Sequence, residues 1–230
     1  MKKVFIGVGH GGSDPGAMAS RFKEADINLV MALAAAEDLT RHGVQVGLSR
    51  EKDENDPLIE SIREANAFAP DLAFDCHNNA GGGDGFEVYR QTGKHASNSV
   101  KLAQLMEKQV KLIGQNSRGV KTKLNPNGTD YFGWLRQLNC PAVLLEGAFI
   151  DNAEDVKAID TIEEQKAFGV AYSKAALEYL GIEWQQKKTL TKGKSLQSGF
   201  FTNPIYAQAA LDEARKNGQN MILVDAERYI

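Results

Sequence analysis

The fold class is decided by the stretch Lys3-Val4-Phe5-Ile6-Gly7-Val8-Gly9-His10-Gly11-Gly12, near the start of the 230-residue chain. Its first six residues form a short apolar run that ends in glycines. Such a run is typical of a central strand, buried on both faces, whose carboxyl end opens into a loop. Apolar residues then recur at helical spacing from Asp26 to His42, and Gly43 is suited to cap that helix. We therefore expect strand, loop and helix as the first unit.

The alternation of strands and helices continues to about residue 180. Further strands are predicted at 44–48, 72–76, 86–89 and 142–145, and further helices at 58–68, 97–113 and 162–180. Strands that alternate with helices of this length favour an α/β fold, with a mostly parallel twisted sheet and helices on both faces. We expect the strand at 86–89 to lie at an edge of the sheet and residues 115–133 to be irregular.

The composition changes after Gly181, which divides the chain into three parts. Residues 1–181 are predicted to form the main domain. Residues 182–196 are rich in Gln, Lys, Thr, Ser and Gly, which is typical of a linker. Residues 197–230 are predicted to be a small C-terminal α+β appendage, with a helix at 205–217 and a strand at 221–225. So short a segment holds little core of its own, so we expect it to dock, to dimerise or to bind a partner.

Charge and composition exclude several classes of function. The net charge of −3 and the pI near 5.9 disfavour nucleic-acid binding, which needs clustered Lys and Arg. Cys76 and Cys140 are the only cysteines, and we predict both to be free thiols near strand ends. The N-terminal apolar run stops too early for a signal peptide, and no stretch approaches the roughly 18 apolar residues of a membrane span. We predict synthesis in the cytoplasm and no membrane anchor.

Three polar residues follow predicted strands: His10, His77 and Glu146. Because the carboxyl ends of parallel strands share one edge of the sheet, we expect these side chains to converge on one crevice. Glu146 comes directly after four apolar residues, where an unpaired charge is costly. It therefore needs a partner, either a metal ion or a buried Lys or Arg. Arg136 is the only basic residue close to it in sequence.

Zinc suits these residue types better than other metals, since imidazole nitrogen and carboxylate oxygen are its usual ligands. Catalytic zinc takes three protein ligands, and two histidines with one glutamate are an established set. The third ligand should lie near His10, where Asp14, Glu24 and Asp26 are all candidates. The alternative is that His10 and His77 are ordinary turn residues, which is common for a histidine in a glycine-rich loop.

A series of short motifs makes the sequence recognisable. In chain order they are Val8-Gly9-His10-Gly11-Gly12, Asp14-Pro15-Gly16-Ala17, Lys23 to Leu29, Ser49-Arg50, Arg63-Glu64-Ala65-Asn66, His77-Asn78-Asn79-Ala80, Gly85-Phe86-Glu87 and Pro141 to Glu146. Over about residues 1–180, this series resembles the zinc-dependent N-acetylmuramoyl-L-alanine amidases of the amidase 3 family. Asn78 stands where the family usually has alanine, and Ser49 where it has threonine. Neither departure removes a group that the chemistry needs.

The resemblance implies a function and a role for each site residue. His10, Glu24 and His77 would hold one catalytic Zn²⁺, and Glu146 would be the general base. The substrate would be peptidoglycan, cut at the amide bond between N-acetylmuramic acid and L-alanine. A wall hydrolase without a signal peptide favours a phage endolysin, with a mother-cell sporulation lysin as the alternative. Residues 197–230 would then be a cell-wall binding or dimerisation module.

Two other functions stay open on the sequence. A zinc peptidase that cuts within the stem peptide would use the same ligands. A nucleotide-binding protein would use the loop Gly9 to Gly12 to hold phosphate. The second has little support, because neither G-x-G-x-x-G nor G-x-x-x-x-G-K-[ST] occurs there.

Overall fold

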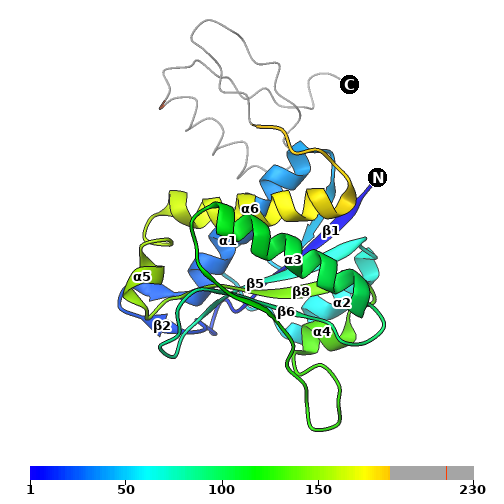
Figure 1. Ribbon diagram of the computed structural model, residues 1–230, viewed down its shortest axis with the longest axis horizontal. Coiled ribbons are helices and arrows are strands. Elements are labelled where there is room, and N and C mark those ends of the chain that lie inside the picture. Colours follow the sequence, from blue (N-terminus) through cyan, green and yellow to red (C-terminus); the bar gives the residue numbers. More distant parts are fainter. Residues whose placement is uncertain (187–215, 217–230) are drawn as a thin grey trace, which may run out of the picture. The chain divides into compact units, whose positions relative to one another are not determined.

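The computed structural model describes residues 1–186 and residue 216. Residues 1–184 form one compact unit, shown in Figure 1. The module predicted at 197–230 lies outside the described residues, residue 216 excepted, and so does most of the predicted linker. The description below therefore concerns the first unit alone.

Strands and helices alternate along this unit. Its strands are β1 (Lys3–Val8), β2 (Met18–Ala19), β3 (Phe22–Lys23), β4 (Gln45–Leu48), β5 (Leu72–Asn79), β6 (Phe86–Arg90), β7 (Ser117–Lys121) and β8 (Ala142–Phe149). Its helices are α1 (Glu24–Arg41), α2 (Leu58–Phe68), α3 (Ala96–Leu112), α4 (Gly133–Gln137), α5 (Ala153–Val156) and α6 (Ile162–Leu180). The predicted helix-and-strand order is thus observed, with the short elements β2, β3, α4 and α5 and the strand β7 added.

The six-stranded sheet has the order β4-β1-β5-β8-β6-β7. The first four strands of that order run parallel, β6 pairs with β8 antiparallel, and β7 pairs with β6 parallel. This confirms a mostly parallel α/β sheet. The expectation that residues 86–89 form an edge strand is wrong, because β7 adds outside β6. Residues 117–121, expected to be irregular, are that edge strand.

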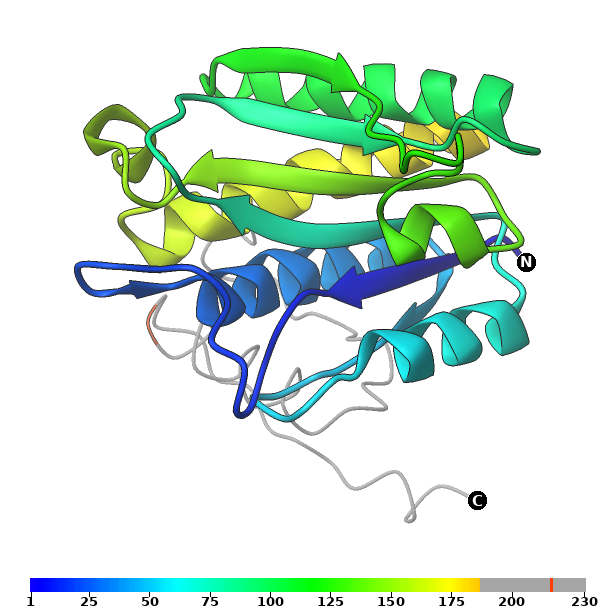
Figure 2. The ribbon, with the colours of Figure 1, turned by 90° about the horizontal axis from the view of Figure 1, so that it is seen from below.

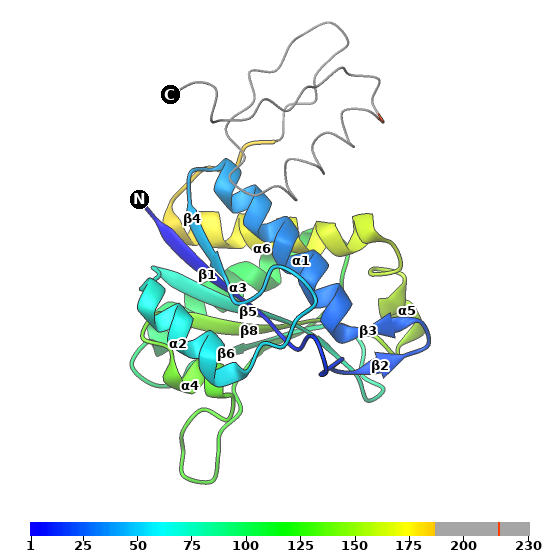
Figure 3. The ribbon, with the colours of Figure 1, turned by 180° about the vertical axis from the view of Figure 1, so that it is seen from behind.

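Helices cover both faces of the sheet (Figures 1 and 3). Helices α1, α3 and α6 pack on one face, where the larger core includes Phe74, Leu145 and Tyr172. Helices α2 and α4 cover the other face, where a smaller core surrounds Trp134. Figure 2 views the molecule from this second side. Because side chains alternate along a strand, this is the face that carries Leu144 of β8 and, two residues on, Glu146.

Two central strands are longer than predicted. β5 continues past Cys76 to Asn79, and β8 continues past Leu145 to Phe149. His77 and Glu146 therefore lie inside strands and do not follow them. The predicted bounds followed the runs of apolar residues, which end at Cys76 and Leu145. The backbone pairing between the two strands continues through His77 and Glu146.

Local signals fix the ends of the last helix. α6 begins with a capping box, in which the Thr161 and Glu164 side chains each accept from the other's backbone, and it ends at Gly181 in the left-handed conformation. Ile182 and Trp184 then pack against the larger core. Both cysteines are free thiols, as predicted, and both are buried. In the part of the chain that the structure describes, no helix is long and apolar enough to cross a membrane.

Candidate active site

His10 lies two residues after β1, in a loop held in place by a buried arginine. The Arg50 guanidinium donates to the carbonyls of Val8, Gly9 and Ala25, which belong to β1, the loop and α1. His10 itself adopts a left-handed backbone conformation (φ 64°) that is uncommon for residues other than glycine. The loop thus turns sharply at His10 and directs its ring toward the start of α1.

Glu24 is the first residue of α1, and its carboxylate points back toward the sheet. One of its oxygens accepts from the Ala17 amide (2.9 Å) and the other from the Asn78 amide (3.1 Å). A helix N-terminus also favours a negative charge. Of the other two candidate carboxylates, Asp26 is exposed on the helix, and Asp14 contacts the outer side of His10. Glu24 is therefore the carboxylate that lies between the histidines.

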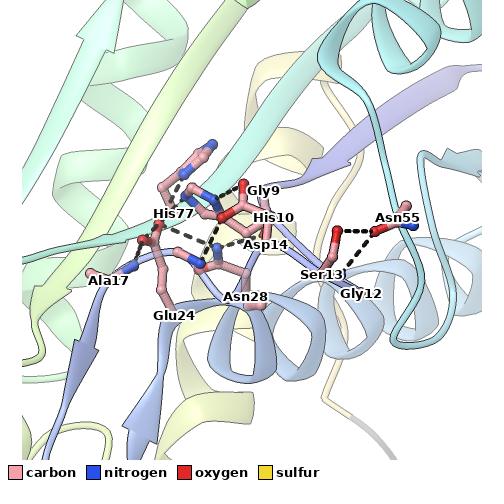
Figure 4. A network of polar contacts seen from close by, with 12 residues as sticks. Gly9, His10, Gly12, Ser13, Asp14, Ala17, Glu24, Asn28, Asn55 and His77 are labelled. Carbon is pink, nitrogen blue, oxygen red and sulfur yellow. Dashed lines mark hydrogen bonds and ion pairs between the residues drawn. The ribbon is translucent and has the colours of Figure 1, made fainter.

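The structure brings His10, Glu24 and His77 together from three different elements (Figure 4). His77 Nδ1 lies 2.9 Å from Glu24 Oε1, and His10 Nε2 lies 3.2 Å from Glu24 Oε2. The two imidazole rings are nearly perpendicular, with centroids 5.1 Å apart. One potential ligand atom from each residue lies within 4.8 Å of the others.

The electrostatics of this cluster favour a cation. Burial alone would raise the pKa of Glu24, but hydrogen bonds with His10 and His77 outweigh it and hold that pKa well below its usual range. The hydrogen bond with Glu24 raises the pKa of His10. Burial would lower the pKa of His77, yet the charge of Asp75 and hydrogen bonds with Asp75 and Glu24 raise it well above its usual value. Without a metal, the cluster therefore attracts protons to balance its carboxylates.

The donor set fits a zinc ion. Tetrahedral ligands about 2.0–2.2 Å from zinc are roughly 3.3–3.6 Å apart, and the potential ligand atoms of the three residues lie within 4.8 Å of one another. Two imidazole nitrogens and one carboxylate oxygen would supply three ligands and leave the fourth position to water or substrate. A divalent ion would also replace the protons that the carboxylates attract.

Glu146 lies on β8 beside this cluster. It is the register partner of His77 on one side and of Glu87, in β6, on the other. Burial is the main reason that the pKa of Glu146 rises to about 7; the charge of His77 opposes the rise, and nearby carboxylates support it. Arg136 donates instead to the carbonyls of Asp130 and Tyr131. Among the residues that the structure describes, no ion pair or hydrogen bond engages the Glu146 carboxylate.

These side chains open into a pocket of about 590 Å³ on the α2 and α4 side of the sheet. His10, His77 and Glu146 line it together with Asp75, while Phe132 and Trp134 supply an apolar wall. Part of the remaining lining is polar and comes from the loop before α2, including Asn55 and Asp56. The pocket can therefore hold a substrate with both polar and apolar parts against Glu146.

Three functional neighbours were not predicted from the sequence. Arg50 was identified only as part of a family motif, although a buried arginine after a strand could have been suspected of a clamping role. Glu87 was likewise only part of a motif, yet it faces Glu146. Asp75 contacts His77 Nε2 at 3.3 Å, and nothing in a single sequence indicates that pairing.

The loop after His10 does not form a phosphate cradle. The Gly12 amide donates to Asp53 Oδ1 (2.7 Å) and the Ser13 amide donates to Asn55 Oδ1 (2.9 Å). Figure 4 shows the Asn55 side chain beside the loop at Gly12 and Ser13. The Gly11 amide donates to the Asp14 carbonyl. Backbone donors that would hold phosphate in such a loop are therefore already engaged.

Known proteins are similar to this chain in sequence. The family model described as N-acetylmuramoyl-L-alanine amidase matches residues 4–178. The sporulation-specific N-acetylmuramoyl-L-alanine amidase of Bacillus subtilis (strain 168) is 30% identical over 227 residues, which are 97% of this chain and 85% of that protein. The endolysin of Bacillus phage SPP1 is 36% identical over 183 residues, covering 74% of this chain and 65% of the endolysin.

A solved structure agrees with these sequence relatives. The catalytic domain of CwlV, an N-acetylmuramoyl-L-alanine amidase from Bacillus (Paenibacillus) polymyxa var. colistinus, superimposes with a TM-score of 0.70 and 25% identity. The match covers 80% of this chain and all of that domain. Fold, family model and relatives lead to one assignment: the chain belongs to the N-acetylmuramoyl-L-alanine amidase family.

Proposed function

We propose that this chain hydrolyses the amide bond between N-acetylmuramic acid and L-alanine of peptidoglycan, with one Zn²⁺ held by His10, Glu24 and His77. The observation that carries the proposal is the cluster of these three side chains beside a glutamate that has no protein partner among the described residues. Membership of the amidase family supports the choice of bond.

The chain's own residues supply positioning and proton transfer. Zinc, when bound, acts as a Lewis acid that polarises the scissile carbonyl and makes a water acidic. Glu146 takes a proton from the attacking water and later passes it to the nitrogen of the L-alanine leaving group. A pKa of about 7 suits both steps near neutral pH, because the carboxylate can accept a proton and release it again. The pocket holds the bond against Glu146.

Product analysis tests the reaction. Purified peptidoglycan digested by the protein should release new amino-terminal alanine without new reducing sugar ends. A chelator should stop the release, and added Zn²⁺ should restore it. New amino termini of residues other than alanine would instead show a peptidase acting within the stem peptide, and reducing ends alone would show a glycosidase. Either result would overturn the proposal.

For the biological setting we favour a phage endolysin. The SPP1 endolysin supports this assignment through its 36% identity. The sporulation amidase of B. subtilis supports the alternative of a sporulation lysin, because that similarity extends over 97% of the chain. Abundance of the protein after prophage induction and during sporulation separates the two. Appearance during sporulation alone would exclude the endolysin role.

We propose further that residues 197–230 form a cell-wall binding or dimerisation module. The linker predicted at 182–196 would then begin after Trp184, where the compact unit of residues 1–184 ends. The similarity to the sporulation amidase covers 97% of the chain, so it includes most of this segment. Wall pull-down and sedimentation of the full chain, compared with a chain that ends at residue 186, provide the test. Equal wall binding and equal mass per particle would contradict both roles.

A further inference from the structure

His77 has a second carboxylate neighbour, on the side of its ring that faces away from Glu24. Its Nδ1 lies near Glu24 Oε1, and its Nε2 lies 3.3 Å from Asp75 Oδ2. Asp75 is two residues earlier in β5, so both side chains lie on the same face of the sheet. The Asp75 side chain is 7% exposed. Among residues 1–186, His77 is the only hydrogen-bond or ion-pair partner of this carboxylate.

The neighbouring strand leaves space for this pair. Gly7 of β1 is the register partner of Asp75, and Gly9 follows two residues later. A Cβ added at Gly7 would lie 2.4 Å from Asp75 Oδ1, and one added at Gly9 would lie 2.2 Å from His77 Cε1. Neither glycine has a positive φ, so backbone conformation does not require glycine at these positions. Glycine is required at both positions because the Asp75 and His77 side chains occupy the space that a Cβ atom would need.

We propose that Asp75 is a positioning residue for the metal site, which accepts a hydrogen bond from His77 Nε2–H and so keeps Nδ1 free to bind zinc. A hydrogen bond at one ring nitrogen fixes the tautomer and the orientation of an imidazole ligand. The buried negative charge of Asp75 also makes the imidazole a more basic, and so stronger, ligand for zinc. This inference rests on the proposed zinc site.

His10 provides an internal comparison. Its Nδ1 lies 2.8 Å from Asp14 Oδ2, so this ring also has a carboxylate on its outer nitrogen. The Asp14 side chain, however, is 66% exposed. Water can replace an exposed hydrogen-bond partner and screens its charge, whereas it does so poorly for a buried one. The two pairs are alike in chemistry and differ in burial, so Asp14 is the matched control for Asp75.

The test measures zinc affinity in the full-length chain by competition with a chromogenic chelator at fixed pH. Asp75→Ala should weaken zinc binding about 10- to 100-fold, the range for loss of such an outer partner. Asp75→Asn keeps the shape and an acceptor oxygen but loses the charge. Its zinc affinity should therefore lie between that of Asp75→Ala and that of the parent. Asp14→Asn should weaken binding less than Asp75→Asn does. The absorption spectrum of the Co²⁺ form should change with Asp75→Ala, because the ring is no longer held.

A second variant covers the case in which Asp75→Ala folds poorly. Gly7→Ala retains Asp75 but displaces its carboxylate, so it should also weaken zinc binding. In a protein that already carries Asp75→Ala, Gly7→Ala should cause little further loss of zinc affinity. Parent-like zinc affinity and an unchanged Co²⁺ spectrum in folded Asp75→Ala or Gly7→Ala would overturn the inference. A parent protein that binds zinc and cleaves at alanine would then still support the proposed function. A parent that binds no zinc would instead contradict the metal site itself.

Discussion

Glu87 and Glu146 are register partners on the antiparallel strands β6 and β8, and their side chains lie on the same face of the sheet. Glu87 pairs with Arg118 and Lys121, while among the described residues the one cation that acts on the charge of Glu146 is His77. Burial would raise the pKa of Glu87, but hydrogen bonds from its partners outweigh it and lower the pKa. The pKa values of these two adjacent carboxylates are therefore shifted in opposite directions. This pattern is typical of active sites in which one carboxylate transfers protons.

The pH dependence of the reaction should report Glu146. Its pKa of about 7 means that the carboxylate is increasingly protonated as the pH falls through that value. A general base works only when it is deprotonated, so kcat/KM should decrease on the acid side. A bound dication nearby lowers the pKa of a carboxylate, which places the acid limb at or below pH 7. Rates measured on soluble muropeptides between pH 4 and 9 give this limb.

Glu87→Gln should move that limb to lower pH. The substitution removes a negative charge that faces Glu146 and leaves Arg118 and Lys121 without their partner, and both changes stabilise ionised Glu146. We expect a shift of roughly half a unit to one unit, given an effective dielectric constant near 20. Glu60→Gln, at an exposed glutamate of α2, is the control and should leave the limb in place. A shift to higher pH with Glu87→Gln would contradict the assignment of this limb to Glu146.

Glu146→Gln should separate catalysis from metal binding. The amide has the shape of the carboxylate but cannot accept the water's proton, so kcat should fall by about 10²- to 10⁴-fold. Zinc content should stay at the parent level, because Glu146 is not among the three clustered ligand residues. His10→Ala and His77→Ala should lose zinc as well as activity. Metal analysis of the purified variants checks both statements, and turnover by Glu146→Gln at the parent rate would remove Glu146 from the mechanism.

Arg50→Met should destabilise the fold around the site. Arg50 is 2% exposed, and its guanidinium donates to carbonyls of β1, α1 and the loop at Lys52. Methionine keeps the apolar stem but removes all the hydrogen bonds that the guanidinium donates, which should cost about 3 kcal/mol of unfolding free energy. Arg63→Met is the control, because the Arg63 side chain is 73% exposed and pairs with the exposed Glu60 of the same helix. Urea unfolding of both variants makes the comparison. An equal loss of unfolding free energy in the two would contradict a stabilising role for the Arg50 hydrogen bonds.

Strong local signals explain which elements could be predicted. The bounds of β1, α2 and α6 agree with the sequence-based prediction. β1 is apolar on both faces, α2 ends shortly before Pro70, and α6 lies between a capping box and Gly181. β7 was missed because its sequence, Ser117 to Lys121, contains a glycine and no apolar alternation. Its pairing with β6 depends on long-range register that a local pattern does not contain.

The site was predictable to the extent that strand positions determine it. The ends of β1, β5 and β8 adjoin because parallel central strands share an edge, and this reasoning selected His10, His77 and Glu146. It did not select Glu24 over Asp14 and Asp26, which needed the family resemblance. The structure shows why the choice falls on Glu24: the Ala17 and Asn78 amides hold its carboxylate between the histidines. Asp75 escaped prediction because its role depends on the register of β5 against Gly7 and Gly9.

Trp184 gives a final prediction, because the sequence placed it in the linker at 182–196. Its indole packs on the larger core, Nε1 donates to Asp38 Oδ2 (2.9 Å), and the Lys174 ammonium lies 4.0 Å from the ring centroid. Trp184→Ala should therefore lower the unfolding free energy by about 2–3 kcal/mol through lost burial and the lost hydrogen bond. Glu183→Ala changes an exposed neighbour and should be nearly neutral. If urea unfolding showed the two variants to be equally stable, the catalytic unit would end before Trp184, where the composition changes.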